Sequence, residues 1–139
     1  MFLLKNLMVA ALVMGMRVVR PVGGDVEVIA EAIARTDATP YEATMLAAIA
    51  WREGGFNLGI IGDGGRAYGT WQLHNAPRSV LTNADQAARR ALYVLRYSIA
   101  HCPSAHLAAY AGAPCGSRTA KIISRDREYI RQQMFGGAL

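Results

Sequence analysis

An apolar stretch between a helix start signal and a helix stop signal most constrains the fold of this chain. Thr39-Pro40-Tyr41-Glu42 is a capping box with proline at the first helical position, which predicts a helix start. Mostly apolar residues follow, up to Glu53-Gly54-Gly55. A glycine pair ends a helix because glycine adopts positive φ without strain. The sequence therefore predicts a mostly buried helix that carries a carboxylate, Glu53, on its last turn.

Glu53 has the surroundings expected of a general acid. Apolar neighbours favour the neutral carboxyl group over the charged carboxylate. The unpaired carbonyl groups of the helix end carry partial negative charge, which acts in the same direction. The one basic neighbour in sequence is Arg52, and consecutive helix residues do not face each other. A carboxyl group that stays protonated near neutral pH can donate a proton in catalysis. The alternative is a helix-terminal glutamate that points to water.

The segment after this helix is rich in glycine, polar and aromatic residues, and it lacks the apolar period of a core helix. It predicts a short irregular hairpin or loop that lines a cleft. Aromatic rings there could stack on sugar rings, and polar side chains could bind hydroxyl groups. The alternative is a glycine-rich turn whose aromatic rings fold into the core. The candidates are Phe56, Tyr68 and Trp71 for stacking, and Asn57, Gln72 and His74 for hydroxyl groups.

Three motifs, in this order, resemble the soluble lytic transglycosylases of the lysozyme-like superfamily. Glu53-Gly54-Gly55-Phe56 resembles the family's glutamate motif, although serine more often stands where Gly54 does. Tyr68-Gly69-Thr70-Trp71-Gln72-Leu73 is similar to its Gly-x-x-Gln-type turn. Ala109-Tyr110-Ala111-Gly112 resembles its Ala-Tyr-Asn-like motif, with Ala111 in place of the usual asparagine. The similarity spans roughly residues 39 to 117.

The resemblance implies a mostly α-helical, lysozyme-like single domain with a short irregular hairpin or loop beside the active-site cleft. It implies cleavage of β-1,4 glycosidic bonds in peptidoglycan, with Glu53 as general acid and then base. Tyr110 would lie near Glu53 and orient it. Gly69 and Gln72 would line the glycan cleft, with Phe56, Tyr68 and Trp71 as packing or stacking residues. Peptidoglycan glycan strands are the expected partner, and no cofactor or metal is implied.

Three other functions stay open. A lysozyme-type hydrolase needs a second carboxylate, and Asp63 is the one carboxylate between Glu53 and Asp85. Its glycine neighbours favour a turn-forming role instead. A Cys/His peptidase acting on cell-wall peptides would use Cys115, which lacks the helix N-terminus that activates a thiol. A non-enzymatic, wall-binding or virion module would leave Glu53 without a catalytic role.

Composition favours one compact domain with an anionic partner. The chain has 139 residues, of which 53% are hydrophobic and 18% charged, so it can build a core. Its net charge of +5 suits an anionic partner: nucleic acid, an acidic membrane face, or a bacterial wall that bears phosphate and carboxylate groups. No basic stripe interleaves with aromatic residues, so nucleic acid is not an expected partner. The basic run over residues 118–131 is interpreted as a solvated helix face. The three histidines have no partner at zinc-ligand spacing.

Cys102 and Cys115 flank a segment, residues 104–112, that is predicted to form a short helix. A disulfide between them would pin the end of a long helix to the following loop. It would also imply an oxidising compartment. The alternative is a pair of buried free thiols.

The N-terminal segment, residues 1–22, precedes a catalytic domain expected over residues 24–139. Lys5 and the apolar run after it resemble a signal-peptide core and are too short for a confident membrane span. Three interpretations stay open: an uncleaved signal or anchor, a helix packed on the domain or on a partner protein, and a cleaved signal. The expected location is extracytoplasmic, whether secreted, periplasmic or membrane-anchored, or on a phage virion as part of a lysin.

Further helices are predicted from their caps. Asp25 is expected to cap a helix through Ile33, and Thr82 or Asn83 to cap a long helix that ends at His101. A last helix is expected over residues 118–135.

Overall fold

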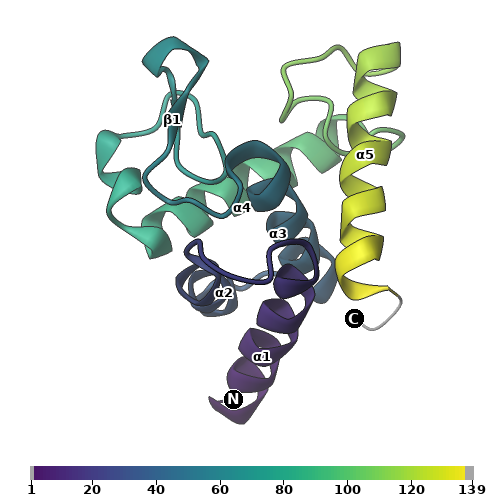
Figure 1. Cartoon of the computed structure of the whole chain (residues 1–139). Helices are drawn as coiled ribbons and strands as arrows, with labels where there is room; N and C mark the ends of the chain where they lie inside the picture. Colours follow the sequence, from purple (N-terminus) through teal and green to yellow (C-terminus); the bar gives the residue numbers. More distant parts are fainter. Residues whose placement is uncertain (1, 137–139) are drawn as a thin grey trace.

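The computed structural model describes residues 2–136 and has a mostly helical fold with a small two-stranded hairpin, which confirms the predicted fold class. Helix α3 contacts all the other α-helices, the hairpin lies near the end of α3, and α1 leads away from the body (Figure 1). The elements in chain order are α1 (Phe2–Val19), α2 (Val26–Arg35), α3 (Pro40–Gly54), β1 (Ile61–Gly62), η1 (Asp63–Gly65), β2 (Ala67–Tyr68), η2 (Arg78–Leu81), α4 (Ala84–His101) and α5 (Arg118–Phe135).

Helix α3 begins and ends at the predicted signals. The Thr39 hydroxyl accepts from the Glu42 backbone N–H at 3.2 Å, and the Thr39 N–H donates to the Glu42 carboxylate at 2.8 Å. Gly55 ends the helix with φ of 60°. Residues 43–50 between these ends are buried, so α3 forms the centre of the core.

Of the two other predicted caps, one is confirmed, and the last helix begins at its predicted residue. Asn83 caps α4 by accepting from the Gln86 N–H at 3.0 Å, and α5 begins where it was predicted. Asp25 makes no side-chain cap on α2, so that prediction is wrong. Its carboxylate instead accepts from the Leu58 N–H at 2.9 Å. Asp25 therefore ties the start of α2 to the loop after α3.

The C-terminal half of α1 belongs to the domain core. Leu12 and Met16 are fully buried. Gly15 lies against the ring of Phe135 in α5, and a Cβ at this position would collide with that ring. The predicted boundary between an N-terminal segment (1–22) and a domain (24–139) therefore does not separate two structural units. Of the three interpretations of this segment, packing on the domain describes its second half.

The predicted hairpin is present and short. Ile61 pairs with Tyr68 and Gly62 with Ala67 in antiparallel register. The chain then turns back, so that Tyr68 also pairs with Leu73. This double turn places residues 69–72 next to the end of α3.

Residues 104–112 form a series of turns, so the predicted short helix is wrong. Two of the backbone N–H groups that a helix would use donate elsewhere: Leu107 N–H to the Ser124 hydroxyl and Tyr110 N–H to the Ser98 hydroxyl, each at 3.0 Å. These contacts with α4 and α5 replace helical hydrogen bonds. The predicted disulfide between Cys102 and Cys115 is present and joins the two ends of this segment.

Candidate active site

Glu53 lies at the end of α3, where the helix is pressed against the turn over residues 69–72. A Cβ at Gly54 would collide with the backbone of Thr70. Thr70 is fully buried, and its hydroxyl donates to the Ala50 carbonyl in α3 at 2.8 Å. Gly54 therefore has two roles. It belongs to the glycine pair that ends α3, and its lack of a side chain lets the turn over residues 69–72 pack against the helix. The Glu53 side chain remains 30% exposed.

A cleft brings together Glu53, Gln72, His74 and Tyr110, which were all candidates from the sequence, and the alternative carboxylate Asp63 also lines it. One part of it is a cavity of about 270 Å³. An adjoining cavity of about 410 Å³ shares five lining residues with the first and extends it along residues 109–112. The first cavity is lined by Glu53, Asp63, Ala67, Gln72, His74, Tyr110, Ala111, Ile123 and Arg127. The hairpin, the turns over 104–112 and α5 thus converge on the end of α3.

Gln72 is held in the cleft by its own turn. Its backbone has a positive φ of 49°, and its side-chain amide donates to the Gly69 carbonyl at 2.9 Å. A Cβ at Gly62 would collide with the Gln72 amide oxygen, so the glycine of β1 makes room for this side chain. Gly69 also has positive φ, 76°, and its carbonyl is engaged by Gln72. The Gly69 N–H donates to the Ile60 carbonyl at 2.7 Å.

Tyr110 lies beside Glu53 without bonding to it. Its hydroxyl donates to the Trp71 carbonyl at 2.8 Å. Burial raises the pKa of Tyr110, the negative charge of Glu53 raises it further, and Arg127 acts in the opposite direction. The tyrosine is therefore a neutral donor whose hydrogen bond fixes the turn that carries Gln72. Tyr110 can therefore affect the orientation of Glu53 only by packing beside it, not through a hydrogen bond to it.

Arg127 of α5 is the site residue that the sequence analysis missed. Its guanidinium forms an ion pair with Glu53 and bonds Asp126 at 2.6 Å. Asp126 in turn binds Arg52 through two hydrogen bonds. The Arg52 guanidinium, and to a lesser degree Arg127, holds the pKa of the Asp126 carboxyl below its usual value. Four alternating charges thus link the end of α3 to α5.

The sequence analysis found Arg52 as the one basic neighbour of Glu53 in the chain, whereas the fold brings Arg127 into direct contact with it. The missed signal lies in the spacing of α5, where Ile123, Ile130 and Met134 face inward at helical intervals. Arg127 occupies the same face, only 13% of its side chain is exposed, and it needs a buried partner.

Asp63 lines the same cleft as Glu53. It begins η1 with φ of 49°, which fits the expected turn-forming role. Its carboxylate is 53% exposed and lies 3.6 Å from the His74 ring nitrogen. His74 therefore has a carboxylate neighbour that sequence spacing did not reveal. Within residues 2–136, no group of three or more acidic, histidine or cysteine side chains is placed to hold a metal ion.

Two of the three candidate stacking residues, Phe56 and Trp71, lie in the core. Both are fully buried, and the Trp71 indole N–H donates to the Leu46 carbonyl at 2.9 Å. Their rings therefore have no face open to a sugar, which favours packing over stacking. Tyr68 is half-buried in β2 and does not line the cleft around Glu53.

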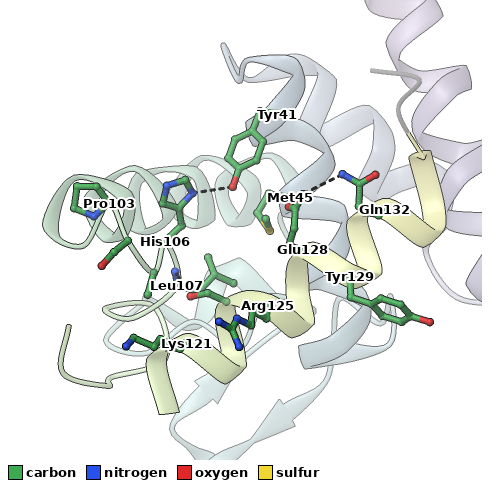
Figure 2. A pocket seen from close by; sticks show the side chains of 13 residues that line it. Tyr41, Met45, Pro103, His106, Leu107, Lys121, Arg125, Glu128, Tyr129 and Gln132 are labelled. Atoms are coloured by element: carbon green, nitrogen blue, oxygen red, sulfur yellow. Dashed lines mark hydrogen bonds between the residues drawn. The ribbon is translucent and has the colours of Figure 1, made fainter. Parts of the chain in front are cut away.

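A larger cavity, about 750 Å³, lies elsewhere. It is bounded by the start of α3, the turn over residues 103–107 and the opposite face of α5 (Figure 2). The Tyr41 hydroxyl bonds the His106 ring at 2.8 Å across it, and Glu128 is engaged by Arg131 and Gln132. None of the predicted site residues lines it. The smaller cleft is the better candidate because it contains Glu53 at a constrained helix end.

No protein-family model, curated protein or solved structure matches this chain. The resemblance to lytic transglycosylases therefore rests on the residues of the three motifs.

Proposed function

We propose that this protein cleaves β-1,4 glycosidic bonds in peptidoglycan as a lytic transglycosylase, with Glu53 as its general acid and base. The observation that carries the proposal is the shared cleft: Glu53, Gln72 and Tyr110 come from three separate sequence motifs and lie around one cavity. The mostly helical fold with a hairpin beside that cavity supports it. The proposed setting is extracytoplasmic or virion-associated, with which the disulfide and the apolar α1 are compatible.

The proposed reaction uses one carboxyl group for two proton transfers. Protonated Glu53 donates its proton to the glycosidic oxygen as the bond from that oxygen to the sugar C1 breaks. The resulting carboxylate then takes the proton of the C6 hydroxyl of the same sugar, and the O6 atom bonds to C1. The product carries a 1,6-anhydro end, no water is consumed, and Glu53 is protonated again.

Arg127 must release Glu53 for this chemistry to begin. Its contact with Asp126 offers a route, since Arg127 keeps one carboxylate partner after it leaves the other. A bound glycan would exclude water from the cleft and favour the neutral form of a carboxyl group. In the proposal, substrate binding thus converts an ion-paired carboxylate into the acid.

Two alternatives have support from particular residues. Asp63 lines the same cleft as Glu53, which favours a lysozyme-type hydrolase with Asp63 as the second carboxylate. The ion pair between Glu53 and Arg127 favours a wall-binding module without catalysis, because it occupies the proposed acid. The three functions predict different outcomes with purified peptidoglycan.

The test is release of soluble muropeptides from purified sacculi, followed by mass spectrometry. Glu53→Gln keeps the size of the side chain but removes the proton, so the rate should fall by at least about 10²-fold. Glu31→Gln, an exposed glutamate of α2, is the matched control and should keep the wild-type rate. If Glu53→Gln released muropeptides as fast as the wild type, Glu53 would not be the acid. Binding of sacculi without any release would support the wall-binding module.

A further inference from the structure

Helix α1 has two faces with opposite environments. Leu12, Gly15 and Met16 face the core and are buried. On the opposite side, large apolar side chains at helical spacing face solvent along the whole length of the helix. These residues, named here the α1 stripe, are Leu4, Leu7, Met14 and Val18, with exposed fractions of 69%, 59%, 74% and 61%. Residues three, four and seven positions apart share a helix face, so the stripe is continuous and carries no charge.

The first turn of α1 is apolar on its other sides as well. Phe2 and Leu3 precede the α1 stripe at Leu4, and they are 81% and 70% exposed. Three consecutive helix residues point in directions about 100° apart, so no single flat partner covers all three. Lys5 is the only charged residue in the first ten positions of the chain. Figure 1 shows this end of α1 projecting away from the other helices.

This distribution of exposed apolar side chains favours a lipid bilayer over a second copy of the chain as the partner of α1. A partner helix would cover the α1 stripe but leave Phe2 and Leu3 in water. Lipid chains adapt to exposed side chains that point in several directions. One side of the first turns is not available to lipid, because Phe2, Lys5, Asn6 and Val9 line a cavity there with Glu31, Ala34 and Arg35 of α2. The net charge of +5 also attracts the protein to an anionic lipid surface and repels a second copy.

The depth of insertion follows from the core contacts. By length and composition α1 could cross a membrane, and its 18 residues span about 27 Å. Leu12 and Met16 are, however, fixed in the domain core, so the second half of α1 cannot enter lipid while the domain is folded. Residues 2–11 precede Leu12 over about 15 Å, and Met8 and Val9 among them also pack against the core. This length is about half of the roughly 30 Å hydrocarbon core, so residues 2–11 do not by themselves span a bilayer.

We propose that α1 is a retained membrane anchor that inserts its first turns into one leaflet at a shallow angle. The N-terminal part of the α1 stripe, Leu4 and Leu7, faces the acyl chains, while the C-terminal half of α1 stays in the domain core. The segment is therefore not a removable leader, because its loss would open the core at Leu12, Gly15 and Met16. The inference is independent of the proposed catalysis, and Glu53→Gln should bind lipid like the wild type.

Flotation of the full chain with vesicles tests the anchor. The wild type should float with vesicles of phosphatidylglycerol and phosphatidylcholine, and less with phosphatidylcholine alone. The double variant Leu4→Glu/Leu7→Glu should bind about tenfold more weakly or worse, because both side chains lie on the α1 stripe. The matched control is Val28→Glu/Ile122→Glu, which changes two exposed apolar residues elsewhere and adds the same charge. It should float more strongly than the stripe variant.

The outcomes separate the anchor from its alternatives. Circular dichroism of both double variants should show the wild-type helix content, since all four positions are exposed. Equal flotation of the stripe variant and the control would overturn the proposal, as would a lack of flotation by the wild type. A dimer in sedimentation that depends on Leu4 and Leu7, without vesicle binding, would assign the stripe to a second copy. A folded, exported protein that lacks residues 1–16 would also contradict it.

Discussion

Glu53 and Arg127 form an ion pair across the contact between α3 and α5, although they are 74 positions apart in the chain. Arg127 also bonds Asp126, which is held by Arg52 of α3. The proposed acid is therefore part of a charge network that also fastens two helices together. This relationship makes Arg127 the residue whose replacement is most informative about the unliganded site.

Replacing Arg127 by glutamine should raise the rate of the proposed activity. Glu53 then no longer has to leave an ion pair before it acts, so muropeptide release from sacculi should be faster than in the wild type. The free energy of unfolding should fall by about 1 kcal/mol or less, since Glu53 is partly exposed. Arg125→Gln is the control, because Arg125 lines the other cavity and has no carboxylate partner among residues 2–136. An unchanged rate for Arg127→Gln would remove Arg127 from the mechanism.

Replacing Asp63 by asparagine should distinguish transglycosylase from hydrolase chemistry. With Glu53 as the one catalytic carboxylate, Asp63→Asn should keep most of the activity, and the products should carry 1,6-anhydro ends. Mass spectrometry detects such ends because they are one water lighter than reducing ends. Reducing ends together with an inactive Asp63→Asn would instead establish a two-carboxylate hydrolase.

Gly54→Ala should destabilise the protein even though Gly54 is a helical residue. Alanine normally stabilises a helix by about 1 kcal/mol relative to glycine. Here the added Cβ collides with the Thr70 backbone, so we expect a loss of roughly 1–3 kcal/mol and lower activity. Gly59→Ala is the control, since no atom lies within 4 Å of its added Cβ. Chemical denaturation measures both, and a stabilised Gly54→Ala would show that the helix end and the turn are not in close contact.

The capping box of α3 should make stability depend on pH in the acid range. Hydrogen bonding to Arg96 lowers the pKa of Glu42, burial opposes this, and the Thr39 N–H lowers it further. Ionised Glu42 therefore adds stability that is complete above its unfolded value of about 4.3 and is lost as pH falls through the lower folded value. Glu42→Gln should cost about 1 kcal/mol at pH 7 and almost nothing near pH 2. If Glu42→Gln lowered the free energy of unfolding by the same amount at pH 2 and at pH 7, the ionised Glu42 carboxylate would not be the source of this stability.

The local features of the fold could be predicted because each depends on residues close together in the chain. The capping box at Thr39, the glycine stop after Glu53 and the Asn83 cap each act within about one helical turn. The hairpin and the disulfide between Cys102 and Cys115 also followed from glycine content and short spacing.

Contacts between distant segments decided the rest. Residues 104–112 do not form the predicted helix, because the N–H groups of Leu107 and Tyr110 donate to serine hydroxyls on two other helices. The acceptors are Ser124 and Ser98, respectively. The Asp25 carboxylate accepts from the Leu58 N–H instead of capping α2. The rings of Phe56 and Trp71 are buried because they pack in the core around α3. No local pattern states which helices will be neighbours, so these choices become visible only after the chain has packed.

The same distinction between local sequence and contacts of distant segments applies to the candidate site. Sequence alone placed Glu53 on a helix end and determined that α1 is apolar, and the family resemblance predicted that Gln72 and Tyr110 lie near Glu53. Only the tertiary structure brought Arg127 to Glu53 and buried one face of α1 while leaving the other in solvent. The physical reason is that an ion pair or a buried face depends on the distance between side chains, and folding, not sequence spacing, sets that distance.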